Sequence, residues 1–209
     1  MTKRKETAQQ IFDRWAVDYH ADGMENSHWQ SVRQVFRNIP QSNGNYLEIG
    51  IGNGYGIGYM ASHQYDRGMC YGLDVSTNMV KKAQRRLKDL SNVYLEQADF
   101  LNWEPPENIR FSSIFSMEVF YYFSDPQTGI SRAMSFLEPE GRLFVLVNYY
   151  LENKSTHSWP EDLNTSMTLW SEKEYKDAFV QAGLTEIQQM RINPGPDDTG
   201  TLCTIGTKE

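Results

Sequence analysis

The feature that most constrains the fold of this chain is a short apolar segment that runs directly into a glycine-rich loop, YLEIGIGNGYG at residues 46–56. Glycine has no Cβ, so a strand that ends in such a loop lets the backbone approach a bulky ligand closely. A second apolar run, residues 69–73, ends in Asp74, twenty residues after Gly54. An acid at that offset can accept hydrogen bonds from ribose hydroxyls. The two features together predict a site for an adenosine-containing cofactor.

The spacing of the glycines narrows the kind of cofactor. Three positions after the second, third and fourth glycine of the loop stand Tyr55, Ile57 and Tyr59, so no register gives the dinucleotide fingerprint G-x-G-x-x-G. The chain also lacks the P-loop pattern G-x-x-x-x-G-K-[ST]. Glu48 lies just before the loop, and an acid there suits a cationic or amine-bearing ligand better than a pyrophosphate.

Length and charge indicate one acidic α/β domain without the excess of basic residues that is typical of nucleic-acid-binding proteins. The chain has 209 residues, a net charge of −7 and a pI of about 5.2, which disfavours partners such as nucleic acid or an anionic membrane. No apolar run is long enough for a membrane span, and the basic residues 3–5 are followed by polar residues, unlike a signal peptide. Cys70 and Cys203 fit buried thiols in a reducing cytoplasm, and no histidine has zinc-like spacing. We expect a metal-free cytoplasmic protein.

Helical and strand patterns alternate along the chain, which predicts a parallel sheet covered by helices. The last two strands follow each other without a helix, so we expect an antiparallel pair at one edge. A basic run in the helix after Asp74 fits a solvated face. Predicted helices cover residues 6–19, 27–38, from the glycine loop to 64, from 76 or 77 to 90, 125–137 and 171–183; predicted strands cover 45–50, 69–74, 92–97, 111–117, 142–148, 185–192 and 200–207.

From about residue 42 to its end, the chain resembles the class I S-adenosylmethionine-dependent methyltransferases. Glu48 and the glycines after it match motif I of that family, which lies under the methionine part of the cofactor, and Asp74 matches the acid that holds both ribose hydroxyls. The resemblance implies an α/β Rossmann-like three-layer sandwich. Its seven-stranded, mostly parallel sheet would have the order 3-2-1-4-5-7-6 and an antiparallel last strand.

The same resemblance supplies the other candidate site residues. It implies that Met79 packs on the adenine, that Asp99 accepts from the adenine amino group, and that residues 116–118 lie beside the sulfonium and the nucleophile. Other interpretations stay open: Asp99 as a capping acid, Met79 as core, and Glu118 as a structural acceptor. The predicted cofactor-binding residues are Tyr19, Glu48, Gly50, Gly52, Gly54, Asp74, Val75, Met79, Asp99, Phe100 and Met117; the predicted catalytic residues are Glu118 and Tyr121.

We expect one methyltransferase domain over residues 1–209, with residues 1–40 as a helical lid and 149–170 as a substrate-side insertion. The lid would bring Tyr19 or His20 to the methionine end of the cofactor. Aromatic residues should roof the acceptor pocket and, with Glu118, suit a small organic acceptor such as an amine. They are Trp15, Tyr19, His28, Trp29, Tyr149, Tyr150, His157, Trp159 and the segment 119–123.

The predicted function is methyl transfer from S-adenosylmethionine to a small-molecule acceptor, with S-adenosylhomocysteine as product. This is an in-line displacement that depends mainly on positioning in a dry site, with a general base only where the acceptor is protonated. The fourth strand lacks the Asn/Asp-Pro-Pro-aromatic signature of amino- and base-methylating relatives, and this departure, together with the acidic charge, counts against nucleic-acid substrates. We expect a monomer or homodimer. A nicotinamide-dependent oxidoreductase and a non-catalytic cofactor-binding module remain alternatives.

Overall fold

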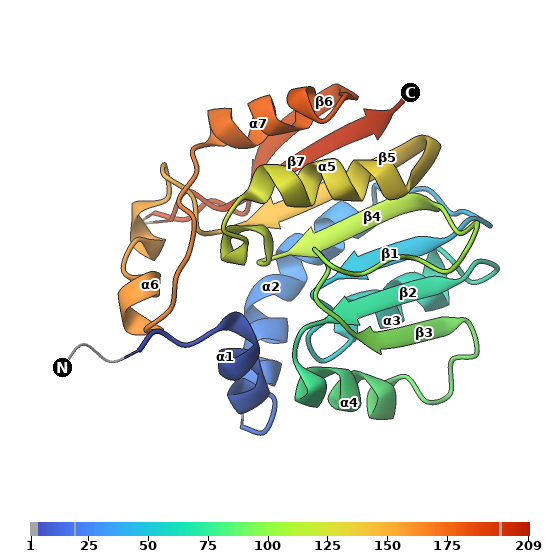
Figure 1. The fold of residues 1–209 in the computed structure, drawn as a ribbon, viewed down its shortest axis with the longest axis horizontal. Coiled ribbons are helices and arrows are strands. Elements are labelled where there is room, and N and C mark those ends of the chain that lie inside the picture. The colour runs from blue at the N-terminus through green and yellow to red at the C-terminus, as the bar shows by residue number, and fades with distance from the viewer. Residues whose placement is uncertain (1–3, 19, 197) are drawn as a thin grey trace.

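Seven strands form one sheet in the order β3-β2-β1-β4-β5-β7-β6 (Figure 1). In the computed structural model, which describes residues 4–18, 20–196 and 198–209, the first four pairings are parallel and those of β7 with β5 and β6 are antiparallel. Both the predicted strand order and the predicted antiparallel edge are confirmed. The strands are β1 (Tyr46–Ile49), β2 (Cys70–Asp74), β3 (Val93–Gln97), β4 (Phe111–Met117), β5 (Leu137–Val147), β6 (Leu184–Ile192) and β7 (Thr201–Lys208).

Helices cover both faces of the sheet, as expected for mainly apolar central strands that are buried on both faces. All positions of β1 and β2 are buried. On one face α5 and α7 pack on residues such as Leu47 and Ile114, and on the other face α2, α3 and α4 pack on residues such as Cys70 and Phe115. The helices are α1 (Ala8–Trp15), α2 (His20–Phe36), α3 (Tyr55–His63), α4 (Thr77–Arg86), α5 (Pro126–Phe136), α6 (Trp159–Asp162) and α7 (Glu172–Gln181). None of the helices in the described residues is both long and apolar enough to cross a membrane.

The register of the three central strands brings their carboxyl ends together. Ile49 of β1 is the partner of Leu73 in β2 and of Ser116 in β4. The glycine loop, Asp74 and Glu118 therefore follow three neighbouring strands at the same edge of the sheet. Because neighbouring strands lie about 4.8 Å apart, the ends of β2 and β4 are roughly 10 Å apart across β1.

The two largest differences from the predicted boundaries have local reasons. The second helix begins at His20 and not at Ser27, whose hydroxyl donates to the Met24 carbonyl inside the helix and not to a cap. β5 begins at Leu137 and not at residue 142, because Leu137 pairs with Phe111 before an irregularity that contains Glu140 at φ +64°. The connection 149–170 contains a 3-10 helix at Lys154–Thr156 and the short α6.

Candidate active site

A cavity of about 880 Å³ lies at the carboxyl ends of β1, β2 and β4, between the sheet and α1. Its volume falls in the range of ligand pockets that bury a drug-sized molecule. The cavity brings together most of the predicted site residues: Glu48, Gly50, Gly52, Asp74, Val75, Asp99, Phe100, Met117, Glu118 and Tyr121 all line it.

Two of the predicted cofactor residues that the structure describes, Gly54 and Met79, are not among those that line the cavity. Gly54 caps α3 at φ +84°, and a Cβ there would lie 2.9 Å from the Cβ of Ala83, so this glycine allows α3 to approach α4. Met79 is fully buried beneath α1, in a cluster with Ala16. Tyr19 lies outside the described residues, and the side chain of His20 is not described either.

The carboxylate of Asp74 is held by backbone amides of two loops. The Gly52 amide donates to Oδ2 at 2.9 Å, and the Ser76 amide donates to Oδ1 at 2.8 Å. Burial raises the pKa of Asp74 to about 6, against the lowering effect of these two hydrogen bonds. Each carboxylate oxygen can still accept a further hydrogen bond. The geometry therefore leaves Asp74 able to accept from a ligand in the cavity.

Glu48 is buried between β1 and α3. Its Oε2 accepts from the Tyr46 hydroxyl at 2.9 Å, and burial raises its pKa to about 8. A Cβ on Gly56 would lie only 2.6 Å from Glu48 Oε1, so this glycine leaves room for the carboxyl group. The role of Gly56 was missed from the sequence, although its place in the glycine loop is visible there.

Glu118 follows β4 with φ +60°, a conformation that few residues other than glycine, Asn and Asp adopt. The Asn148 amide donates to its Oε1, and the Tyr121 hydroxyl donates to its Oε2 at 2.9 Å. Burial raises the pKa of Glu118 to about 8, and burial also raises the pKa of Tyr121. Strained backbone of this kind is characteristic of functional sites.

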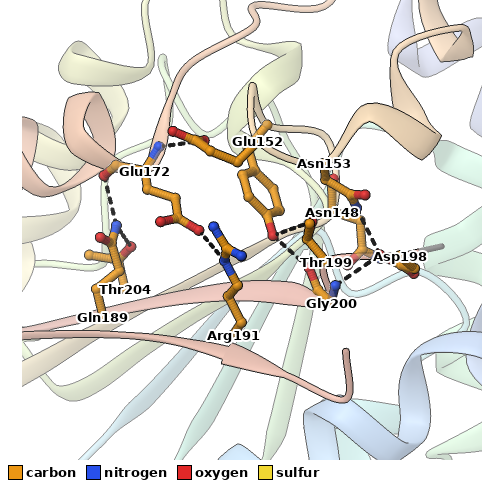
Figure 2. A network of polar contacts seen from close by, with 11 residues as sticks. Asn148, Glu152, Asn153, Glu172, Gln189, Arg191, Asp198, Thr199, Gly200 and Thr204 are labelled. Carbon is orange, nitrogen blue, oxygen red and sulfur yellow. Dashed lines mark hydrogen bonds and ion pairs between the residues drawn. The ribbon is translucent and has the colours of Figure 1, made fainter. Parts of the chain in front are cut away.

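A polar network behind the site fixes the Asn148 peptide (Figure 2). The Asn153 side chain is buried, and its Nδ2 donates to the Asn148 carbonyl and to Asp198 Oδ1, each at 3.0 Å. Asp198 Oδ1 also accepts from the Gly200 amide at 2.9 Å. The loop between β6 and β7 thus orients the peptide that binds Glu118.

The segment of residues 4–16, which we call the N-terminal strap, covers the cavity. Glu6 forms a parallel bridge with Thr165, in which its amide donates to the Asn164 carbonyl at 2.8 Å. Farther along, Asp13 Oδ1 accepts from the Ser76 hydroxyl at 2.6 Å and from the Asn78 amide at 3.1 Å. The strap is therefore fastened at two places, to the 149–170 connection and to the start of α4.

Aromatic side chains form much of the wall under the strap. The ring of Phe12 packs edge-on against Trp15 at 5.6 Å and against Tyr122 at 5.5 Å between centroids. Of the predicted roof, Trp15, His28, Trp159 and most of the segment 119–123 line the cavity. The residues Trp29, Phe120, Tyr149, Tyr150 and His157 are not among the lining residues.

The basic run on α4 is not simply a solvated face. Lys82 pairs with Asp22 at 3.0 Å, and Arg86 makes two hydrogen bonds with the Glu25 carboxylate at 2.6 and 2.8 Å. Glu25 also accepts from Asn53 Nδ2 at 2.8 Å. Asn53, which lines the cavity, was missed as a candidate although it stands inside the glycine loop.

Comparison with known proteins identifies the family. The profile of the methyltransferase domain family matches residues 47–141. A chain from the solved complex between the Haloferax volcanii Trm112 methyltransferase activator and a protein described as a methyltransferase is 30% identical to this chain, with a TM-score of 0.83. The match covers 94% of this chain and 96% of that one. The chain belongs to the class I S-adenosylmethionine-dependent methyltransferases.

Other relatives share the fold at lower identity. The N-methyltransferase NodS of Bradyrhizobium japonicum WM9, solved with S-adenosylhomocysteine, is 19% identical with a TM-score of 0.75 over 97% of this chain and 99% of that chain. Phosphoethanolamine N-methyltransferase of Plasmodium falciparum is 24% identical over 165 residues, which are 76% of this chain and 60% of that protein. The chain spans less than two thirds of the length of the curated relatives it matches.

The cavity of this methyltransferase fits S-adenosylmethionine. Gly52 has φ +53°, and a Cβ there would have no neighbour within 4 Å, so the loop leaves open space where a ligand can approach the backbone. Asp74 offers hydrogen-bond acceptors to a ligand, and Asp99 and Phe100 also line the cavity. Among the described residues, no group of three or more His, Cys, Asp or Glu side chains could hold a metal ion.

Proposed function

We propose that the protein transfers a methyl group from S-adenosylmethionine to a small-molecule acceptor held under the N-terminal strap. The observation that carries this proposal is the cavity itself, which is covered by the strap and carries Asp74 and Glu118 at the ends of β2 and β4. When bound, the cofactor supplies a methyl group already activated on a sulfonium, which the acceptor takes up in an in-line displacement. A covered cavity favours a small acceptor over a macromolecule.

The proposed cofactor-binding residues divide along the sheet edge. Asp74 would accept from the ribose hydroxyls, with Gly50 and Gly52 giving backbone access beside it. Val75, Asp99 and Phe100 would bind the adenine, while Glu48 and Met117 would lie toward the methionine end. Gly54 and Met79 would act indirectly, by packing the loop and the start of α4.

Glu118 and Tyr121 are proposed to act on the acceptor. A carboxyl group with a pKa of about 8 is a suitable general base near neutral pH, because it can take a proton and still be ionised in part of the population. The Tyr121 hydroxyl and the Asn148 amide hold the two oxygens of Glu118 in one orientation. These contacts and the covered site would position the acceptor and exclude water.

We propose that the strap and the first part of α2 form a lid, and that residues 149–170 are the acceptor-side insertion of a single domain. Phe12 and Trp15 of the strap and Trp159 of α6 line the cavity from these two segments. Cytoplasmic location and a monomeric or homodimeric state stay predictions from the sequence.

A second candidate function is methyl transfer that requires an activator protein. The Haloferax volcanii relative was solved with Trm112, so we propose as an alternative that this chain also works with a protein of that kind. Co-expression with Trm112 followed by size-exclusion chromatography tests this candidate: co-elution together with a higher methylation rate would support it. Full activity of the isolated chain, unchanged by Trm112, would contradict it.

The main proposal is tested by titration calorimetry of the purified chain with S-adenosylmethionine and with S-adenosylhomocysteine, with NADH as the comparison ligand. We expect both adenosyl ligands to bind and NADH not to bind. A screen of metabolites with labelled methyl donor then separates an enzyme from a non-catalytic binding module. Binding of NADH without binding of either adenosyl ligand would favour the oxidoreductase alternative.

A further inference from the structure

The cavity wall, as far as the structure describes it, contains carboxyl groups without matching basic side chains. Among the described lining residues there are several acids but no Lys or Arg. Two of these acids belong to the acceptor side, because Glu118 follows β4 and Asp162 ends α6. The acids are Glu48, Asp74, Asp99, Glu118 and Asp162.

Two arginines near the site are paired with acids outside the cavity wall. Arg14 of the strap makes two hydrogen bonds with Glu6, at 2.8 and 2.9 Å, and Arg86 binds Glu25. His28 does line the cavity, but burial lowers its pKa to about 4, so its imidazole is neutral near pH 7. An anionic ligand would therefore find no cation on the described walls.

The neutral part of the wall suits a cation. Phe12, Trp15, Tyr122 and Trp159 all line the cavity, and the first three are in ring contact with one another through Phe12. The face of an aromatic ring attracts an ammonium group, most strongly where water is excluded. The cavity is thus lined by aromatic rings, which can pack on an ammonium group, and by carboxyl groups, which can pair with its charge.

Resting on the proposed methyl transfer, we infer that the acceptor is an amine without a phosphate group, bound as an ammonium ion between Glu118 and the aromatic wall. One N–H bond of the ammonium breaks, its proton forms an O–H bond with the Glu118 carboxylate, and the electron pair stays on nitrogen. That pair forms the new N–C bond while the C–S bond breaks and its electrons remain on sulfur. The sulfonium charge is thereby transferred to the methylated nitrogen.

The strongest feature in favour of an anion is the start of α1. The Thr7 hydroxyl already accepts from the Gln10 amide, but Ala8 and Gln9 also line the cavity. A helix N-terminus carries the equivalent of only about +0.5 charge. A phosphate group brings roughly −1.5 to −2 near pH 7, and here it would face carboxyl groups as well. The helix start therefore does not compensate a phosphate.

The test uses the purified full chain saturated with S-adenosylhomocysteine, with tetramethylammonium and inorganic phosphate as probes in saturation-transfer NMR and calorimetry. We expect tetramethylammonium to bind and phosphate not to bind. Trp159→Ala should weaken ammonium binding by about tenfold, the size of a desolvated cation–π contact. Asp162→Lys should weaken ammonium binding and allow phosphate to bind. Glu107→Gln, an exposed acid in the loop before β4, is the matched control and should change neither.

The outcomes separate this inference from the proposed function. If S-adenosylhomocysteine fails to bind, the proposed function falls and the inference with it. If S-adenosylhomocysteine binds but phosphate binds as well as tetramethylammonium, or the ammonium does not bind, the inference is overturned while the proposed function stands. The same contrast is expected in turnover: ethanolamine-type amines should be methylated in preference to their phosphate esters, and the reverse preference would also overturn the inference.

Discussion

Glu118 combines a left-handed backbone with a buried carboxyl group whose two oxygens are both held. A glutamate at φ +60° costs roughly 1–2 kcal/mol relative to glycine. The surrounding contacts must offset that cost: the Asn148 amide and the Tyr121 hydroxyl bind the side chain, and the Glu118 amide donates to the Leu146 carbonyl at 2.9 Å. The side chain is thus fixed before any acceptor arrives.

We expect Glu118→Gln to lower the methyl-transfer rate by about 10²–10⁴-fold while leaving S-adenosylhomocysteine affinity within a few fold. The amide side chain keeps an acceptor oxygen but cannot take a proton. In the unmodified protein the rate should fall as the pH is lowered through about 8, the pKa to which burial raises Glu118, because the base becomes protonated. The measurement is a pH–rate profile for both proteins. An unchanged profile in the variant would show that Glu118 is not the base.

Gly56 gives a second prediction, because its hydrogen atoms face the Glu48 carboxyl group. An alanine at a helical glycine usually stabilises by about 1 kcal/mol. At Gly56 the added Cβ would lie 2.6 Å from Glu48 Oε1, so we expect Gly56→Ala to destabilise by about 1–3 kcal/mol. Urea unfolding measures both effects. Gly23→Ala in α2, where a Cβ has open space, is the control and should stabilise.

At the scale of elements, the attachment of the strap to α4 depends on Asp13, which accepts hydrogen bonds from Ser76 and Asn78 at the start of that helix. We expect Asp13→Ala to release α1 and to speed dissociation of S-adenosylhomocysteine by about tenfold or more, since each charged hydrogen bond contributes about 1.5–3 kcal/mol. Stopped-flow displacement measures the rate. Asp89→Asn, an exposed acid after α4, should leave it unchanged. Equal rates in both variants would show that the strap is not held by this contact.

Most elements could be predicted from the sequence because their signals are local. The Asp125-Pro126 start of α5 and the capping box at Ser171 both specify a helix end within a few residues, and both are found in the structure. The start of α2 could not be placed, because Ser27 has the type of a cap but lies inside the helix. The first part of β5 was also missed, since only its pairing with Phe111 makes Leu137 a strand residue.

The site could be predicted where it follows strand ends, but not where distant segments meet it. Asp74 and Glu118 stand directly after apolar runs, so the topology of the sheet places them together. The bridge between Glu6 and Thr165 and the ion pair between Glu25 and Arg86 join segments far apart in the chain. No spacing rule predicts such contacts. The motif also could not predict that the side chain of Met79 is covered by α1 and does not line the cavity.

For the whole molecule, the two buried glutamates make stability depend on pH. Burial raises the pKa of both Glu48 and Glu118 to about 8, so between pH 6.5 and 8 the folded protein binds more protons than the unfolded chain. The free energy of unfolding should therefore fall as the pH rises through this window, by on the order of 1 kcal/mol per pH unit for each group. His28, with its pKa lowered to about 4, acts in the opposite direction but only below about pH 6.5.

Urea unfolding at pH 6.5 and pH 8 measures this effect. Glu48→Gln should reduce the pH dependence by about half, because its amide does not titrate while Glu118 still does. The exposed Glu107→Gln should reproduce the unmodified protein. A free energy of unfolding that rises over this interval would mean that the carboxyl groups of Glu48 and Glu118 are already ionised in the folded protein.

The bridge between Glu6 and Thr165 has a kinetic consequence. The strap and the 149–170 connection both line the cavity, and the strap can move away from that connection only when this bridge opens. We expect ligand exchange to be fastest while this bridge is open, so that the frequency of its opening would limit the rate of turnover. At low temperature, slower opening of this bridge would make release of S-adenosylhomocysteine the rate-limiting step. That change would be visible as an initial burst of methylated product.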